Sequence, residues 1–535
     1  MDKLIHINQK SIFRSTIYWV YNAVVLLFFL FLIFTVEIMG NAKFISYAYT
    51  LEYMTYLEIT LFVTVFCLSS YYTKKTFQLE DIIHIPVVSR ILARYLGIFC
   101  MSLSVCIIPI LYIFISSSME KTQLSYTLST LIVIVIRWAV IVLLSHSIGF
   151  LASTIIKSIY VYMACIPFVI SFSYLNLLFI DKLPLGETSM IKISQLLSVN
   201  KLFISGMEID YTGLRINRLF FWKTLFLISC SIVIICLLVF FKKPQIKIFL
   251  VTILFVVGCV CSAVGYMISF PEPYISTEKM YLPKAVKPYY IESCSGEIEL
   301  GSISRFRNIE LGLINIGNAE SVTFRLDECF DIESVYSNDI ELDYLHDGDD
   351  LTIFLPAIKR DSCALILNYS GRVSYYSDSQ NVDIFTERLS SALPPRFAFL
   401  PTIDDERKVS YNLTVTSNNI VISNLNVEEI LPGMNNYLLV GNSASICIFS
   451  GYFDAVVIDD MLVYKAKYNK TTAYSDIYNI SQRLKARNRY NMADEDQDLE
   501  QKRYSKVFLI YYFYDTNGFP IVYDDYLIMN YGYIM

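Results

Sequence analysis

The stretch TLSTLIVIVIRWAVIVLLSHSIGF, residues 127–150, is apolar along nearly its whole length and contains one formal charge, Arg137. A run of this length matches roughly 30 Å of bilayer hydrocarbon at about 1.5 Å per helical residue. A helix satisfies all its backbone hydrogen bonds internally, so it is the form such a run takes in lipid. Comparable runs occupy residues 17–39, 53–72, 93–116, 158–180, 219–241 and 247–269. The first 270 residues therefore predict an α-helical membrane bundle of about seven transmembrane helices.

The sequence after residue 270 is polar and rich in tyrosine. Four prolines predict a stiff linker. Residues 409–416 then alternate apolar and polar side chains, which is typical of a half-buried antiparallel strand. We therefore predict a mostly antiparallel, sandwich-like β domain followed by a small α/β tail with a helix over 473–490. The predicted domains are residues 1–245 (six spans), 246–270 (a seventh span), 271–290 (linker), 291–465 (β domain) and 466–535 (tail).

The charges divide between the two halves of the chain. Residues 1–270 hold 20 Lys and Arg against 11 Asp and Glu, whereas residues 271–535 hold 23 against 38. An acidic soluble half argues against nucleic-acid binding. Basic residues precede the first run, separate the second from the third and fill the link before the seventh, which the positive-inside rule makes cytoplasmic. We therefore predict a multi-pass protein of the cytoplasmic membrane with a cytoplasmic N-terminus and an extracellular C-terminal domain.

The segment between the second and third runs, about residues 73–90, is polar and too long for a tight turn. Its apolar residues have roughly helical spacing until Pro86, which predicts a short amphipathic helix over 76–85. The order of helix hairpin, charged segment and IPVVSRIL resembles the six-span permease subunits of ABC-type exporters. Glu80, Pro86, Ser89 and Arg90 stand at the matching positions. The resemblance implies that an ATP-binding subunit docks on Phe77, Leu79, Glu80, Ile82, Ile83, Pro86 and Arg90.

The same resemblance implies further partners for the membrane half. Two copies of the chain, or one copy and a related permease, would enclose a pathway surrounded by membrane lipid. The sequence has no Walker A pattern, GxxxxGK[ST], so we expect ATP hydrolysis on a separate subunit. We accordingly expect no catalytic residue and no cofactor in this chain.

A second resemblance lies in the β region. The text ESVTFRLDECFDIESVYSNDIELDYLHDGDDLTIFLP, residues 320–356, and LILNYSG after it resemble the N-terminal β domain of zinc aminopeptidases of the thermolysin-like clan. That family binds zinc through HExxH, in which two His one helical turn apart hold the metal and the Glu activates water. Neither HExxH nor the family's GxMEN motif occurs here, so we expect no metal site and no peptidase activity. The four histidines are His6, His84, His146 and His346.

Arg137 lies near the middle of its apolar run, where a charge costs at least about 2.5–3.5 kcal/mol. It should therefore face the bundle interior, and Glu58 in the second run is its best partner. The pair either lines an export path or joins two spans structurally. His146 lies nine positions further along, so at about 100° per residue it points to the opposite face. We expect His146 to form an ordinary hydrogen bond between helices.

These observations predict the permease subunit of an ATP-driven ABC exporter, with a non-catalytic outer β domain for binding or docking. The family resemblance implies a peptide or lipid-like substrate, but the sequence does not identify it. Two alternatives remain open. The chain could be a membrane-anchored receptor whose spans only signal, or it could be the membrane half of a zinc peptidase whose HExxH lies on another chain. The four outer cysteines allow two disulfides or separate thiols: Cys294, Cys329, Cys363 and Cys447.

Overall fold

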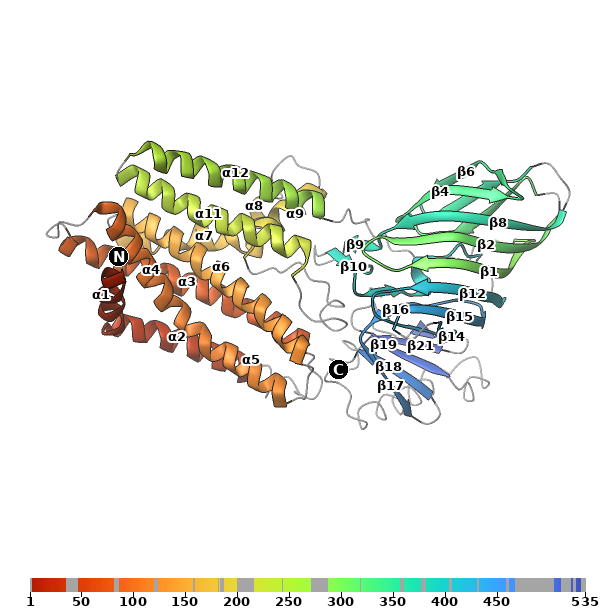
Figure 1. Cartoon of the computed structure of the whole chain (residues 1–535), viewed down its shortest axis with the longest axis horizontal. Coiled ribbons are helices and arrows are strands. Elements are labelled where there is room, and N and C mark those ends of the chain that lie inside the picture. The colour runs from red at the N-terminus through yellow and green to blue at the C-terminus, as the bar shows by residue number, and fades with distance from the viewer. Residues whose placement is uncertain are drawn as a thin grey trace. The chain divides into compact units, whose positions relative to one another are not determined.

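The computed structural model divides into two compact units, which are described separately (Figure 1). Unit 1 holds Met1–Ile204 and Gly213–Pro271, and unit 2 holds Ser205–Thr212 and Glu272–Met535. The structure describes residues 2–34, 47–80, 86–119, 124–156, 159–180, 182, 187–199, 216–242, 244–270, 287–317, 319–356, 360–376, 382–403, 407–430, 433–458, 461–466, 505–510, 521–522 and 526–530.

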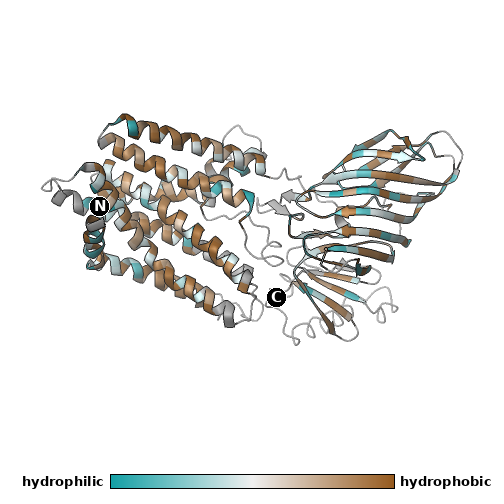
Figure 2. Cartoon of the chain, in the orientation of Figure 1, coloured by the Kyte–Doolittle hydropathy of each residue, from teal (hydrophilic) through white to brown (hydrophobic). Residues whose placement is uncertain are grey.

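Unit 1 is built of helices, most of which are hydrophobic along their length (Figures 1 and 2). The 3-10 turns η3 (Ser104–Cys106), η4 (Ile159–Val161) and η5 (Tyr174–Asn176) lie between them. The helices are α1 (Asp2–Phe13), α2 (Thr16–Ile33), α3 (Tyr47–Glu80), α4 (Val87–Leu103), α5 (Ile107–Met119), α6 (Leu124–Ile155), α7 (Cys165–Phe172), α8 (Leu177–Ile180), α9 (Glu187–Leu197), α11 (Arg218–Lys242) and α12 (Ile246–Ser269).

Five segments within the described residues are long and apolar enough to cross a bilayer. They are Thr16–Ile33, Val88–Tyr112, Thr127–Ile155, Arg218–Phe241 and Ile246–Ser269. Each overlaps one of the seven predicted runs. The chain is therefore a multi-pass membrane protein, because five such helices have no other environment that would cover them.

The other two predicted runs differ from expectation. Residues 53–72 lie in α3, which continues as one helix to Glu80 because no Pro or Gly interrupts it. The single helix predicted over 158–180 is wrong. There α7 ends where Ser173 takes an extended backbone, with φ −113° and ψ 175°, and η5 and α8 follow. Hydropathy averaged over a run does not register such a local change of backbone direction.

Small residues bring the long helices of unit 1 close together. A Cβ atom added to Gly149 of α6 would lie 2.7 Å from the carbonyl oxygen of Phe66 in α3. Ser70 of α3 donates a hydrogen bond to the Gly149 carbonyl at 3.1 Å. A Cβ at Gly265 of α12 would similarly lie 2.6 Å from the Trp222 ring of α11. Close approach of backbones is the usual basis of helix association in lipid.

The sequence did not predict α1, because its twelve residues lie below the length at which hydropathy is informative. Ile12 of α1 is buried, and its carbonyl accepts a hydrogen bond from the Tyr72 hydroxyl of α3 at 3.4 Å. A Cβ at Gly97 of α4 would lie 3.2 Å from Asn8 Cβ of α1. Thus α1 is packed against the bundle rather than attached only through α2.

Unit 2 is built of strands. Its bounds are β1 (Tyr290–Glu299), β2 (Ser304–Gly317), β3 (Ser321–Arg325), β4 (Phe330–Ser337), β5 (Ile340–Glu341), β6 (Tyr344–Asp347), β7 (Asp350–Phe354), β8 (Arg360–Gly371), β9 (Ser374–Tyr376), β10 (Val382–Ile384), β11 (Ser391–Leu393), β12 (Val409–Thr416), β13 (Ile420–Ser423), β14 (Asn426–Glu429), β15 (Asn436–Ser443), β16 (Ile448–Gly451), β17 (Phe453–Ile458), β18 (Met461–Ala466), β19 (Lys506–Ile510), β20 (Ile521–Val522) and β21 (Tyr526–Asn530).

The main sheet has the order β14-β15-β12-β1-β2-β8-β4-β5 and is antiparallel except for the β1–β12 pair. Smaller sheets, β3-β7-β6 and β11-β16-β13, join its hydrophobic core. Within that core the rings of Phe306 and Tyr369 stack at 4.6 Å, and the Tyr369 hydroxyl donates to the Phe399 carbonyl at 2.8 Å. Alternation of buried and exposed residues along β12 follows the predicted pattern.

The last sheet is mixed and has the order β17-β18-β19-β21-β20. Strands β18 and β19 pair in parallel although residues 467–504, which contain the predicted helix 473–490, lie between them and outside the described residues. This sheet therefore combines strands from both sides of the predicted boundary at 465/466. Lys506 of β19 donates to the Ser423 carbonyl at 3.1 Å, which ties this sheet to the rest of the unit.

Candidate functional site

The site that the structure supports best is a buried ion pair between α3 and α6. Arg137 Nη2 donates a hydrogen bond to Glu58 Oε2 at 2.5 Å. The side chains of Arg137 and Glu58 are only 10% and 2% exposed. A charge held in so little water must be compensated by another charge or by hydrogen bonds, and each of these two groups supplies that compensation for the other. The structure thus brings together the two residues that the sequence singles out.

Two further side chains face the same carboxylate. Glu58 interacts with the ammonium of Lys223 in α11 and with the indole of Trp138 in α6. Lys223 and Trp138 are themselves buried, at 6% and 1% exposed. Glu58 is therefore hydrogen-bonded to α6 through Arg137 and lies in the electrostatic field of Lys223 in α11. The sequence analysis did not single out Lys223, although a cation inside the apolar run 219–241 was the available signal.

Thr130 extends this polar region along α6. It lies seven residues before Arg137, and two helical turns place both on the same face. Thr130 is fully buried, and its hydroxyl oxygen has no hydrogen-bond partner among the described groups. A fully buried hydroxyl without a partner costs free energy, and this one lies about 10 Å along α6 from Arg137.

His146 lies apart from this cluster. Its Nε2 is 3.0 Å from the Tyr95 carbonyl oxygen of α4, and its ring lies 4.3 Å from the Tyr95 ring. The neighbouring Ser147 hydroxyl is 2.8 Å from the Tyr95 hydroxyl. These contacts join α6 to α4, on the side of α6 away from Arg137. They are hydrogen bonds between helices, which is the role expected for His146.

The interrupted segment after α7 holds a second polar network. Asn176 in η5 donates to the carbonyl of Ser194 at 3.1 Å and accepts from its hydroxyl at 2.5 Å. The Asn176 amide also lies 3.3 Å from Ser198 Oγ, and all three residues are buried. The Asn176 amide also donates to the Ser171 carbonyl at 3.2 Å, which compensates one backbone group at the end of α7. A Ser-rich stretch with an Asn inside the apolar run was the sequence signal for it.

The predicted coupling segment is only partly a separate element. Phe77, Leu79 and Glu80 lie in the last turns of α3, so the separate helix predicted over 76–85 is wrong in its first half. Ile82 and Ile83 lie outside the described residues. Pro86 is exposed and precedes α4, with its fixed backbone angle suited to a helix start. Arg90 lies in the first turn of α4, and its N–H donates to the Pro86 carbonyl at 3.1 Å.

Unit 2 has a small, open hollow between the starts of β1 and β12. The guanidinium of Arg407 lies 4.4 Å from the centre of the Tyr290 ring at this hollow. Cys294 and Tyr411 line it from the core side. Burial raises the pKa of the Cys294 thiol to about 12, so the thiol is protonated and unreactive at neutral pH. An aromatic ring, a cation and an apolar floor meet here, in a space with room for about one water molecule.

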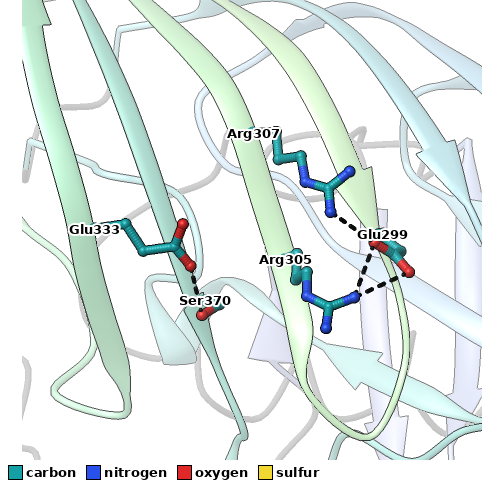
Figure 3. A network of polar contacts seen from close by, with 5 residues as sticks. All are labelled: Glu299, Arg305, Arg307, Glu333 and Ser370. Atoms are coloured by element: carbon teal, nitrogen blue, oxygen red, sulfur yellow. Dashed lines mark hydrogen bonds and ion pairs between the residues drawn. The ribbon is translucent and has the colours of Figure 1, made fainter.

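The outer face of the main sheet is polar and exposed. Arg305 and Arg307 of β2 lie 3.3 Å and 3.5 Å from Glu299 of β1, and Ser370 donates to Glu333 at 3.0 Å (Figure 3). Pairs this exposed contribute about 0–1 kcal/mol each. They are surface contacts on the sheet and do not form a catalytic arrangement.

No group of three His, Cys, Asp or Glu residues that could hold a metal occurs within the described ranges. His346 Nε2 lies 3.1 Å from the Leu326 carbonyl oxygen. None of the four cysteines forms a disulfide in the described part of the unit.

Comparison with known proteins gives a distant likeness for the strand-rich part. No family model matches the chain, and no curated protein matches it. Leukotriene A4 hydrolase from Saccharomyces cerevisiae superposes with a TM-score of 0.33 at 10% identity, over 48% of this chain and 43% of that one. The M1 zinc metallopeptidase from Deinococcus radiodurans gives 0.33 at 11% identity, over 46% and 61%.

In each case the match covers less than two thirds of the known protein. At this level of identity the likeness carries no information on chemistry. Function therefore has to be argued from the residues of this chain, which is a multi-pass membrane protein with a strand-rich second unit.

Proposed function

We propose that this chain is the permease subunit of an ATP-driven exporter, in which unit 1 forms half of a pathway and unit 2 binds or docks ligands outside the membrane. The observation that carries the proposal is the buried Glu58–Arg137 pair with Lys223 beside it. An anchor needs no ionisable groups in its spans, whereas ionisable groups inside a bundle are costly and mark substrate or ion pathways.

The interrupted segment from α7 to α9 supports the same proposal. Backbone that is not helical is tolerated at membrane depth only where protein or a water-filled cavity surrounds it. Broken helices of this kind are a recurrent feature of transport proteins, in which they line binding sites. The buried amide of Asn176 and the hydroxyls of Ser194 and Ser198 provide polar groups there.

The proposed orientation follows from the basic residues. If α3 and the segment from α7 to α8 also cross the bilayer, there are seven crossings in all. Alternation then places Lys10 and Arg14 before α2, Arg90 at the start of α4 and Lys247 at the start of α12 on one side, which is cytoplasmic by the positive-inside rule. The end of α3 and the start of α4 then project toward the cytoplasm, where an ATP-binding subunit would dock around Glu80 and Pro86. Unit 2 would lie outside the cell.

Affinity purification of the full chain from native membranes tests this proposal. We expect an ATPase with a Walker A motif to co-purify in a fixed ratio. Glu80→Arg and Pro86→Leu should each lower its recovery, whereas the matched control Lys408→Gln, at an exposed site in unit 2, should not. Isolation of the chain without an ATPase, or recovery unchanged in both variants, would overturn the proposal.

A receptor is the second candidate, and the exposed guanidinium of Arg407 over the Tyr290 ring favours it. In that case unit 2 would bind a small anionic ligand and the spans would only transmit binding. The measurement that separates the two functions is ligand-dependent ATPase activity of the native complex. A receptor without an ATPase would retain ligand binding at the hollow, and Arg407→Gln would weaken it.

A further inference from the structure

The exposed face of α1 combines cations with apolar side chains. Lys10 and Arg14 are exposed, and at about 100° per residue they lie only about 40° apart around the helix axis. Ile7 lies on one side of this stripe and Phe13 on the other, and they are 61% and 52% exposed. The opposite face of α1 carries Ile12, which is buried against the bundle. We call the exposed set Ile7, Lys10, Phe13 and Arg14 the α1 stripe.

A hydrogen-bonded aromatic joint fixes α1 relative to α2. The indole N–H of Trp19 donates to the Phe13 carbonyl at 3.0 Å, and the two rings meet edge to face at 5.2 Å. Tyr18 packs edge to face on Trp19 at 5.6 Å, and its hydroxyl lies 2.6 Å from Ser104 Oγ. Trp19 is nevertheless 52% exposed. Trp and Tyr at the end of a span are typical of the boundary between hydrocarbon and headgroups.

Contacts on both of its other sides hold α1 at this boundary. Tyr72 of α3 donates to the Ile12 carbonyl, and Gly97 of α4 leaves room for Asn8. Because α2 begins at Thr16, two residues after Arg14, the α1 stripe is held at the level where the first span leaves the membrane. In Figure 1, α1 (dark red) runs across the direction of the neighbouring helices rather than along them.

We propose that the α1 stripe is a binding site for an anionic phospholipid. The ammonium of Lys10 and the guanidinium of Arg14 bind the headgroup phosphate, while Ile7 and Phe13 insert among the acyl chains. The chemistry of the stripe matches this occupant, since a phospholipid presents negative charge next to hydrocarbon. A soluble acidic peptide would satisfy the two cations and leave Ile7 and Phe13 in water.

The proposal requires only that unit 1 lies in a membrane, and it holds whether the bundle transports or signals. It predicts that lipid charge, and not lipid alone, controls binding. Two basic residues near an anionic surface together account for about 30-fold in affinity, and each singly for about fivefold.

The test is thermal melting of the purified full chain in a mild detergent, titrated with phosphatidylglycerol or with phosphatidylcholine. A lipid that binds the folded state raises the melting temperature according to its dissociation constant. The variants are Lys10→Gln/Arg14→Gln and its two single components. The matched control, Arg388→Gln/Lys408→Gln, removes the same charge from exposed positions in unit 2. Sodium phosphate in place of lipid distinguishes a headgroup site from a site for free phosphate.

We expect phosphatidylglycerol to stabilise the wild type and the control at concentrations where phosphatidylcholine has little effect. The double variant should require about 30-fold more phosphatidylglycerol, and each single variant about fivefold more. Equal stabilisation by the two lipids, stabilisation by phosphate alone, or an unchanged midpoint in the double variant and both single variants would overturn the proposal.

Discussion

Removing one member of the buried ion pair should destabilise the bundle strongly and unequally. At 2.5 Å and an effective dielectric constant near 20, the attraction between Glu58 and Arg137 is about 7 kcal/mol. Desolvation of two ions offsets most of that attraction, so the net value of the pair is small. Breaking it leaves an uncompensated charge in a site that water hardly reaches, which costs about 3–5 kcal/mol.

Lys223 makes the two single changes different. Glu58→Gln leaves the cations of Arg137 and Lys223 around a neutral amide, so its destabilisation should be near the upper value, about 5 kcal/mol. Arg137→Gln leaves the Glu58 carboxylate in the field of the Lys223 cation, so the destabilisation by this variant should be nearer the lower value, about 3 kcal/mol. The double variant places two amides together and should cost less than the sum of the singles by about 2–3 kcal/mol.

Reversible unfolding of the full chain in bicelles, followed as a double-mutant cycle, measures these quantities. Lys247→Gln, which removes an exposed charge at the start of α12, is the control and should change stability by less than about 0.5 kcal/mol. Additivity of the two single variants within about 0.5 kcal/mol would refute the coupling. A larger cost for Arg137→Gln than for Glu58→Gln would refute the role assigned to Lys223.

Three further predictions test the packing. Gly149→Ala brings a Cβ within 2.7 Å of the α3 backbone and should lower the stability, followed by melting, by about 1–3 kcal/mol. In the control Gly258→Ala the nearest atom is 3.4 Å from the new Cβ, so the stability should hardly change. Equal effects of the two substitutions would contradict this packing. The sulfurs of Cys230 and Cys259 lie 3.7 Å apart, so a mild membrane-permeant oxidant should protect both from alkylation in mass spectrometry; continued alkylation of both would show different packing. Burial raises the pKa of Cys294 to about 12, so the folded state keeps a proton that the unfolded chain loses above about pH 8.5. Stability should fall from pH ~8.5 to ~10 by about 1.4 kcal/mol per unit more than in Cys294→Ala, and equal slopes would contradict this.

The Glu58–Arg137 pair could be foreseen because composition alone constrains it. A cation in the middle of an apolar run has to find an anion, and few acidic residues lie inside the predicted spans. Lys223 follows the same logic but lies close to the end of its run, where a lysine can also reach the interface. Sequence position therefore could not decide whether Lys223 turns inward, and only the packing of α11 against α6 does so.

The positions where helices end or continue were the hardest property to predict from the sequence. Lys74 and Lys75 change the polarity of the chain, which suggested a new element, yet nothing around them stops a helix and α3 continues to Glu80. In contrast, Ser173 breaks an apolar run without any change in average hydropathy. In unit 2 the parallel pairing of β18 with β19 joins strands separated by a long stretch, which no local pattern signals.

The contacts also indicate which part of unit 1 can move if it transports. The α3–α6 contact has no space at Gly149, and the ion pair near Arg137 would lose its compensation if these two helices separated. The α7–α9 segment contacts α3 through aromatic rings, with Phe168 on Phe66 and Phe172 on Phe62 at 6.3 Å each, and separating such apolar contacts leaves no uncompensated charge. The hydrogen bonds around Asn176 lie within the segment and join η5 to α9. A change of shape should therefore leave α3 and α6 together and displace α7 to α9.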